Sequence, residues 1–348
     1  MAAERAPSGT GDEPLVVAGT AVATGTRINV EIPVARLPTD TWMSMAVSVV
    51  HGTNSGPYLW LTGAVHGDEL NGVEIIRQVL ERIDPKTLNG AVIAVPVVNV
   101  FGFINESRYL PDRRDLNRSF PGTANGSLAS RLAHLVMSEV VAPCSYGIDL
   151  HTGSDNRTNY SQIRADLDDE ETLRIAEAFG APVMIHARMR DGSLREAATT
   201  VGCHVLLYES GEASRFDDEP IEVGVRGVLG VMAALGMRED DHHDTVTRHE
   251  SVRVDSTRWV RARRGGVLRL SVHTGGRVTR GETIGIIGDA FGESTTKVKA
   301  TADGIVIGHT RHPLVSQGDG VVHIAETLPE GLPHSRRLGK APFARQRN

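Results

Sequence analysis

Cysteine, aromatic residues and long apolar runs are all scarce in this sequence. Cys144 and Cys203 are the only cysteines in 348 residues, which excludes a disulfide scaffold. No apolar run approaches the roughly 18 residues that a membrane helix needs. The polar residues 1–14 lack the apolar centre of a secretion signal. The sequence therefore predicts a cytoplasmic protein without a membrane partner.

Positive charge is not in excess either. The chain has 37 Lys and Arg residues against 43 Asp and Glu residues, a net charge of −6, and 4% of its residues are aromatic. Nucleic-acid-binding proteins usually carry a basic stripe or aromatic stacking platforms. The sequence also contains no G-x-S-x-G elbow and no G-x-x-x-x-G-K-[ST] loop. Nucleic-acid binding, serine-dependent hydrolysis and phosphate-loop chemistry are therefore not expected.

From residue 59 onward, short apolar runs alternate with stretches of helical spacing. The runs are almost continuously apolar, which is typical of strands covered on both faces; they are 59–65, 91–98, 147–150, 182–187 and 204–209. Apolar residues recur on one helix face over 73–83 and over 128–136, where Ser127 is placed to cap the helix. Segments 28–35 and 45–52 alternate like antiparallel edge strands. This pattern predicts an α/β fold with a mixed, mostly parallel central sheet flanked by helices.

The composition shifts after the predicted helix that ends near Gly236, where the charged run 238–250 is expected to be a linker or an exposed loop. About 150 residues per domain suggest two domains. Residues 254–325 show short strands and glycine-rich turns in two related halves, which begin at Gly266 and Gly304. Such a repeat predicts a small C-terminal β-sandwich or barrel, with a layout that resembles biotinyl/lipoyl-type domains. The expected organisation is a disordered segment 1–14, a catalytic α/β domain 15–245, a β domain 246–330 and a flexible tail 331–348.

Ligand-type side chains follow four of the predicted strands. They are His66 with Glu69, Asn99, His151, and Glu209 at the end of the last strand. Because binding groups gather beyond the carboxyl ends of strands in open α/β sheets, we expect these side chains to converge.

Two imidazoles and a carboxylate form the most informative group. His66, Glu69 and His151 suit a catalytic zinc ion with one coordination position open for water. Zinc lowers the pKa of bound water to about 7 and polarises a carbonyl oxygen. A separate carboxylate must then pass the proton to the leaving nitrogen, and Glu209 is the candidate. The alternative is structural, with His66 in an exposed loop and His151 as a hydrogen-bonded core residue.

A charged segment between the two histidines suggests a carboxylate anchor. A guanidinium holds a carboxylate through two parallel hydrogen bonds, and a neighbouring amide adds a third. Arg118 with Asn117 would thus anchor a substrate carboxylate, and Arg108 would stabilise the oxyanion of a tetrahedral intermediate. The alternative is a surface loop whose arginines pair with Asp112 and Asp115.

Taken together, the motifs resemble those of one known family. In chain order they read His66-Gly-Asp-Glu69, Asn99…Gly102-Phe103…Arg108-Tyr109, Asp115-Leu-Asn-Arg118-Ser-Phe-Pro-Gly122, Asp149-Leu-His-Thr152 and Glu209-Ser-Gly211. This order is similar to that of the succinylglutamate desuccinylase/aspartoacylase family, a branch of the zinc carboxypeptidase-like fold. The resemblance covers most of residues 45–325.

The resemblance implies a metal centre and a base. By residue-to-residue matching, His66, Glu69 and His151 would bind one zinc ion per chain. Glu209 would act as general base and acid. Here Glu209 is followed by Ser-Gly-Glu instead of a small or apolar residue and paired glycines, which leaves Glu212 as a rival for the base.

The same matching implies a substrate site. Arg108 would polarise the scissile carbonyl, and Asn117 and Arg118 would hold the substrate's α-carboxylate. Asp68 would shape the metal loop, and Asp149 would orient a metal-bound histidine from behind. The family's acyl-binding residues do not map onto this chain, so the acyl group is not implied. Arg164 is a further residue that we expect to face the site.

Three functions follow as hypotheses. The first is a zinc-dependent amidohydrolase that removes an acyl group from a small N-acylated amino acid. The second keeps the fold and the metal but acts as a carboxypeptidase on short peptides. The third is a non-catalytic binding or carrier protein. Homo-oligomerisation is left open by the sequence.

Overall fold

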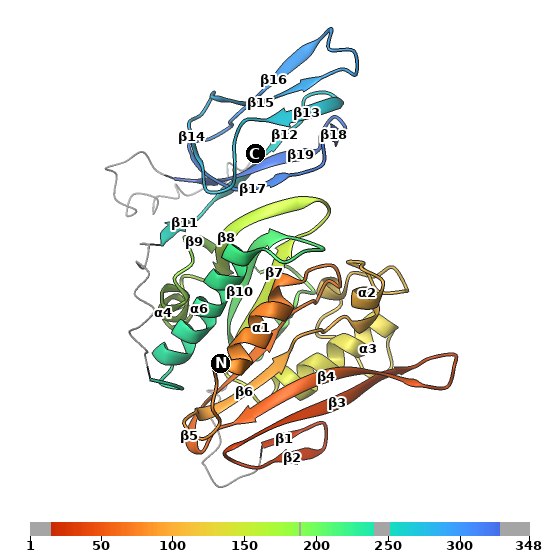
Figure 1. The fold of residues 1–348 in the computed structure, drawn as a ribbon, viewed down its shortest axis with the longest axis vertical. Helices are drawn as coiled ribbons and strands as arrows, with labels where there is room; N and C mark the ends of the chain where they lie inside the picture. The colour runs from red at the N-terminus through yellow and green to blue at the C-terminus, as the bar shows by residue number, and fades with distance from the viewer. Residues whose placement is uncertain (1–14, 188, 240–250, 328–348) are drawn as a thin grey trace, which may run out of the picture.

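The computed structural model describes residues 15–187, 189–239 and 251–327 (Figure 1). The predicted disordered segment 1–14, most of the charged run 238–250 and the predicted tail 331–348 lie outside these ranges. Within the described ranges, no helix is long and apolar enough to cross a membrane.

The fold is built on a 13-stranded mixed sheet. Its parallel centre consists, in spatial order, of β6 (Asn89–Val95), β5 (Asn54–Thr62), β7 (Tyr146–Gly153) and β10 (His204–Glu212). Beyond β6 the sheet continues antiparallel to its edge through β4 (Trp42–His51) and β3 (Thr26–Arg36). The predicted parallel and edge strands are thus confirmed.

On the other side of β10, the sheet contains a strand that the sequence analysis missed. This strand is β8 (Arg157–Ala165), which runs antiparallel to β10. Its sequence RTNYSQIRA has neither a continuous apolar run nor a clear alternation, so neither strand pattern marked it. The short strands β9 (Val183–His186) and β11 (Val252–Val254) continue in parallel from β8.

Helices cover both faces of the central strands. Side chains along each strand alternate between two apolar clusters: Trp60 belongs to one, and its neighbour Leu61 belongs to the other. The Leu61 cluster is covered by α1 (Asn71–Glu81), α4 (Glu170–Phe179) and α6 (Asp218–Ala234). The Trp60 cluster is covered by α3 (Leu128–Leu135), the π-helical segment η2 (Val136–Val141) and α5 (Leu194–Thr200). As predicted, Ser127 caps α3 by accepting a hydrogen bond from the Ser130 amide.

The C-terminal strands form the expected sandwich. One layer contains β12 (Thr257–Arg261), β19 (Gly320–Glu326), β17 (Gly304–Thr310) and β14 (Arg277–Val278). The other contains β16 (Thr295–Lys299), β15 (Thr283–Gly288), β13 (Gly266–Leu270) and β18 (Leu314–Val315).

The two predicted halves of this sandwich exchange their short strands. β14 of the first half pairs with β17 of the second, and β18 of the second pairs with β13 of the first. The sandwich is also not set apart from the rest, because β17 pairs antiparallel with β8. The large sheet therefore runs continuously from the helical layers into the C-terminal strands (Figure 1).

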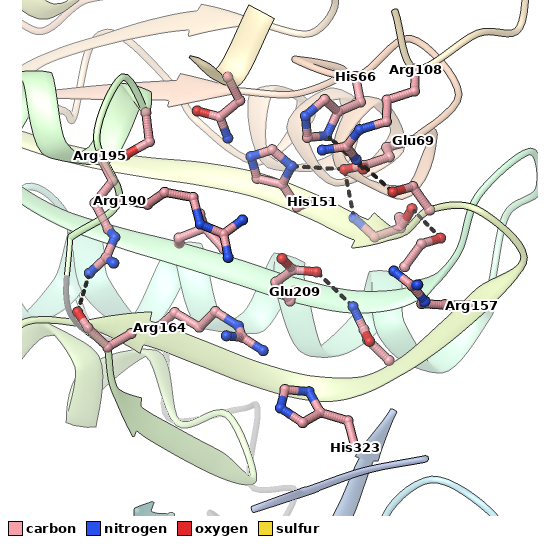
Figure 2. Close-up of a pocket in the computed structure, with 18 of the residues that line it drawn as sticks. His66, Glu69, Arg108, His151, Arg157, Arg164, Arg190, Arg195, Glu209 and His323 are labelled. Atoms are coloured by element: carbon pink, nitrogen blue, oxygen red, sulfur yellow. Dashed lines mark hydrogen bonds and ion pairs between the residues drawn. The ribbon is translucent and has the colours of Figure 1, made fainter. Parts of the chain in front are cut away.

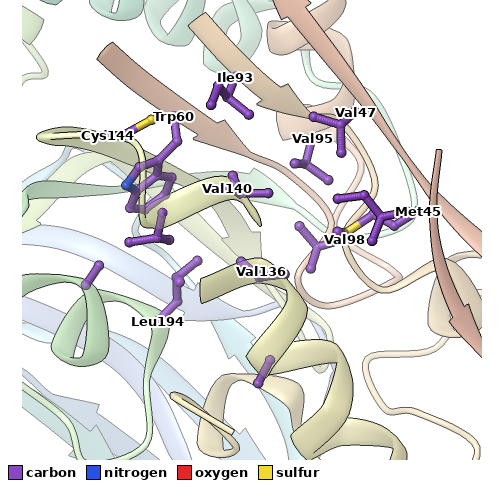
Figure 3. Close-up of a cluster of buried hydrophobic side chains, with 14 of the residues drawn as sticks. Met45, Val47, Trp60, Ile93, Val95, Val98, Val136, Val140, Cys144 and Leu194 are labelled. Atoms are coloured by element: carbon purple, nitrogen blue, oxygen red, sulfur yellow. The ribbon is translucent and has the colours of Figure 1, made fainter. Parts of the chain in front are cut away.

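A large indole and a glycine are matched on neighbouring strands of the centre. Trp60 on β5 is fully buried and lies opposite Gly147 on β7 (Figure 3). A Cβ atom added to Gly147 would lie 1.9 Å from Cε2 of Trp60. The indole therefore needs a glycine on β7, the strand that also carries His151.

We predict that Gly147→Ala lowers the free energy of unfolding by about 1–3 kcal/mol, because the added methyl overpacks a rigid core. Chemical denaturation checks this. Gly288→Ala is the matched control, since the nearest atoms to its added Cβ would lie at 3.7 Å. Equal stability of the two variants would contradict the prediction.

Candidate active site

A cavity of about 320 Å³ lies at the carboxyl ends of the parallel strands. All seven residues predicted for the site line it: His66, Glu69, Arg108, Asn117, Arg118, His151 and Glu209. Segments far apart in the chain thus converge as expected, and Figure 2 shows their side chains around a common space.

The two histidines and Glu69 form a compact buried group. His66 and Glu69 belong to the loop between β5 and α1, and His151 lies on β7. Nδ1 of His66 lies 2.7 Å from Oε1 of Glu69, and Nδ1 of His151 lies 2.8 Å from Oε2 (Figure 2). Each side chain is at most 5% exposed. Burial alone would raise the pKa of Glu69, but the two imidazoles hold it well below its usual range.

The outer nitrogen of each imidazole faces a second carboxylate. Nε2 of His151 lies 2.8 Å from Asp149, whose other oxygen accepts a hydrogen bond from Thr62. Nε2 of His66 lies 3.3 Å from Asp115. An outer carboxylate fixes the tautomer of a metal-binding histidine and raises its basicity. Asp149 therefore lies where the sequence analysis expected it, and Asp115 has the same position behind His66.

This donor set fits a divalent metal ion. Ligand atoms of His66, Glu69 and His151 all lie within 4.8 Å of one another. Both Nδ1 atoms face the shared carboxylate while both Nε2 atoms face outer carboxylates. Two imidazoles and one carboxylate are a common ligand set for catalytic metal sites. His66 is buried, so the exposed loop of the structural alternative is wrong, whereas His151 is a buried and hydrogen-bonded residue as that alternative also expected.

Arg108 lies beside the group of His66, Glu69 and His151, called the metal-type group below. Its Nη1 donates to Ser154 Oγ at 2.6 Å and lies 3.2 Å from His66 Nδ1, and its Nη2 donates to Asp115 at 3.0 Å. Asn99 places this arginine, since its Nδ2 donates to the Arg108 carbonyl. Arg108 therefore pairs with Asp115, as the surface-loop alternative expected, and also lines the cavity.

Glu209 occupies the strand next to His151. The two residues are directly opposed in the parallel pairing of β10 with β7. Oε2 of Glu209 accepts a hydrogen bond of 2.6 Å from Asn159 on β8. Burial raises the pKa of the Glu209 carboxyl, and Arg164 opposes that rise. A buried carboxyl of raised pKa is the kind of group that general acid–base catalysis uses.

The rival base lies outside this cavity. Glu212 lines a separate surface pocket and lies 3.8 Å from Arg215 and 3.7 Å from Arg311.

Asp68, which was predicted to shape the metal loop, ties this loop to residue 214 through its backbone. Its carbonyl accepts a hydrogen bond from the Ser214 amide.

Asn117 and Arg118 line the cavity from a short 3-10 turn, η1 (Leu116–Arg118), before α3. Asn117 is buried, and its Oδ1 accepts a hydrogen bond from the Leu194 amide. Burial and the nearby Arg190 and Arg108 lower the pKa of the Arg118 guanidinium, with Asp115 opposing them. Both residues therefore line the cavity in which they were predicted to anchor a substrate carboxylate.

Further arginines line the cavity. Arg164 was expected there and is present on β8, whereas Arg157, Arg190 and Arg195 were missed. Figure 2 shows Arg164, Arg190 and Arg195 on the side of Glu209 away from Arg108. Among the described residues, Arg164 has a buried Nε without a hydrogen-bond partner. No local motif marks these arginines, so only the folded arrangement shows them as a group.

Two aromatic residues of the C-terminal strands complete the wall. Trp259 on β12 and His323 on β19 stack with ring centroids 4.4 Å apart. Arg157 lies 5.2 Å from the centroid of the Trp259 ring. Burial, with Arg164 and Arg157 nearby, lowers the pKa of His323 to about 3, so its ring stays neutral at physiological pH. The sequence carried no signal for either residue.

The sequence is similar to known proteins over most of its length. A family model of the succinylglutamate desuccinylase/aspartoacylase catalytic domain matches residues 55–235. The N-alpha-acetyl-L-2,4-diaminobutyric acid deacetylase of Halomonas elongata is 28% identical over 302 residues, covering 82% of this chain and 87% of that relative.

Solved structures show the same fold. A succinylglutamate desuccinylase/aspartoacylase from Rhodobacter sphaeroides is 27% identical with a TM-score of 0.77, covering 87% of this chain and 96% of that one. The product-bound ectoine utilization protein EutE (DoeB) from Ruegeria pomeroyi, at 22% identity, has a TM-score of 0.77 and covers 86% and 95%.

The class of protein follows from these matches: it is an enzyme that hydrolyses amide bonds. Because the family model spans more than half of the residues, the chain belongs to the succinylglutamate desuccinylase/aspartoacylase family. The non-catalytic hypothesis is therefore wrong, and the resemblance drawn from the motifs is confirmed.

We predict that Asp149→Asn weakens the affinity for a divalent metal about 10- to 100-fold, because His151 loses the carboxylate that orients it. Competition with a chromogenic chelator measures this affinity directly. Asp112→Asn is the control, since Asp112 lies on the surface beside Arg114. An unchanged affinity in Asp149→Asn would show that this carboxylate does not support the metal site.

Proposed function

We propose that this protein is a zinc-dependent deacylase that removes the acyl group from an N-acylated amino acid. The observation that carries the proposal is the shared position of Glu69 between two imidazole Nδ1 atoms, with the half-buried Glu209 in the same cavity. The names of the relatives, a deacetylase and a desuccinylase/aspartoacylase, support the same reaction type.

His66, Glu69 and His151 would hold the zinc ion, since nitrogen and carboxylate donors suit this metal. When bound, zinc supplies a water of lowered pKa and polarises the acyl carbonyl.

Glu209 moves the proton in this mechanism. Its carboxylate takes the proton from the attacking water and then delivers it to the nitrogen of the departing amino acid. Burial raises the pKa of Glu209 toward neutral pH, which makes the carboxylate a stronger base. The hydrogen bond from Asn159 engages Oε2 and leaves Oε1 to accept the proton.

The arginines bind and stabilise negative charge. Arg108 lies beside His66 and would stabilise the oxyanion that develops on the acyl carbonyl. Asn117 and Arg118, which line the same cavity, would hold the α-carboxylate of the substrate.

The charge of the cavity favours a substrate with a second carboxylate. Among the described residues, six arginines and two carboxylates line the cavity, and Arg190 lies close enough to Arg118, Arg164 and Arg195 to repel them electrostatically. One α-carboxylate does not neutralise this set. A second carboxylate, on the amino-acid side chain or on the acyl chain, would lie against Arg164 and Arg190.

The short-peptide carboxypeptidase has less support. The stacked pair of Trp259 and His323 closes one wall of the cavity. The remaining volume of about 320 Å³ suits a single acylated amino acid better than a peptide chain.

We predict that Glu209→Gln lowers kcat for an N-acyl amino acid at least about 100-fold while the zinc content stays near one per chain, because only the proton shuttle is removed. Amine release and metal analysis give the two readouts. Glu212→Gln, the rival carboxylate outside the cavity, should keep near wild-type activity. A Glu209→Gln variant of wild-type rate would overturn the proposed mechanism.

We also predict that N-acetyl-L-glutamate is hydrolysed with a kcat/KM about tenfold or more above that of its neutral isostere N-acetyl-L-glutamine, because a buried charge pair is gained. Arg190→Gln should reduce this ratio to about one. N-succinyl-L-glutamine tests whether the second carboxylate belongs to the acyl chain instead. N-alpha-acetyl-L-2,4-diaminobutyrate and short peptides complete the panel; a preference for either would contradict the charge argument.

A further inference from the structure

The catalytic carboxylate and the C-terminal sandwich are linked through one side chain. Nδ2 of Asn159 donates to Oε2 of Glu209 at 2.6 Å. Asn159 lies on β8, between the strand that carries Glu209 and the C-terminal strand β17. In the register of these strands, Gly211, Asn159 and Gly308 stand side by side in one row.

An irregularity in β8 brings Asn159 to the side of the sheet on which Glu209 lies. Glu209 pairs with Gln162, and Gly211 pairs with Asn159. The step between these two pairs is two residues on β10 but three residues on β8. β8 therefore has one extra residue at this point, which is a β-bulge. Without the bulge, Tyr160 would stand opposite Gly211. Bulges that re-aim a side chain are common next to active sites.

The missing side chain of Gly308 leaves room for the Asn159 amide. A Cβ atom at Gly308 would lie 2.6 Å from Oδ1 of Asn159, closer than a non-bonded contact allows. The backbone angle φ of Gly308 is not in the left-handed region, so conformational freedom does not explain this glycine. Its absent side chain instead leaves the space that the amide occupies.

A second contact ties the same strands together. Gln162, directly opposite Glu209, is fully buried, and its Nε2 donates to the Ile307 carbonyl on β17 at 3.1 Å. Backbone and side-chain contacts from β17 thus meet β8 on both sides of the bulge.

We propose that Asn159 is a positioning residue for the Glu209 carboxylate, and that strand β17 of the C-terminal sandwich sets the place of the Asn159 amide through Gly308. The proposal rests on the proposed function, in which Glu209 carries the proton. It makes the C-terminal strands part of the support of the base, in addition to the wall that they contribute to the cavity.

Asn159→Asp is the first test, because it keeps the size of the side chain and removes the donor. We expect Asn159→Asp and Asn159→Ala each to lower kcat about 10- to 100-fold, the range for a misplaced catalytic group. KM, zinc content and thermal midpoint should change little. An Asn159→Ala variant with wild-type kcat would show that the amide does not position Glu209 and would overturn the proposal.

The role of β17 is tested by a double-mutant cycle. Gly308→Ala should lower kcat about tenfold in the wild-type background but less than about twofold in the Asn159→Ala background, because it acts through the amide. Gly288→Ala in the other sheet of the sandwich is the control and should leave kcat unchanged. An equal loss of kcat in both backgrounds would overturn the link to Gly308.

Failure of this inference and failure of the proposed function give different results. If Glu209→Gln is inactive while the Asn159 variants are normal, Glu209 remains the base and the positioning role is wrong. If Glu209→Gln keeps its activity, the proposed function itself is wrong. Should Gly308→Ala lower the thermal midpoint strongly, the two Asn159 variants still decide the positioning role.

Discussion

The site depends on one buried carboxylate shared by two imidazoles. Glu69 faces Nδ1 of His66 with one oxygen and Nδ1 of His151 with the other. Buried ionisable groups are costly unless they are paired or bind a metal. The two histidines are 85 positions apart, so this group forms only if β5 and β7 pair in the observed register. The packing of Trp60 against Gly147 supports that pairing on the same two strands.

Charge in the cavity is arranged in two zones. Around the metal-type group, Asp115 and Asp149 offset the imidazoles and Arg108. On the far side of Glu209 lie the arginines Arg164, Arg190 and Arg195. Under the proposed function, the first zone would activate the amide and the second would neutralise the charge of the substrate.

The C-terminal strands are part of the enzyme's working structure. They join the large sheet at β8, supply Trp259 and His323 to the cavity wall, and approach Asn159 through Gly308. Because the sheet is continuous across this junction, a shift of the sandwich would be transmitted to the strand next to Glu209. The predicted domain boundary between residues 245 and 246 stays a prediction. The cavity itself is lined by residues from both sides of that boundary.

The sequence by itself determined the alternating strands and helices, the family and the seven cavity residues, because those residues lie in local motifs at strand ends. It did not determine β8, the arginines Arg157, Arg190 and Arg195, or Trp259 and His323. A polar strand beside an active site has no apolar period, and a lone arginine or tryptophan has no motif. Only the pairing of distant strands decided that these residues surround one carboxylate, because proximity across a sheet is set by register and not by chain order.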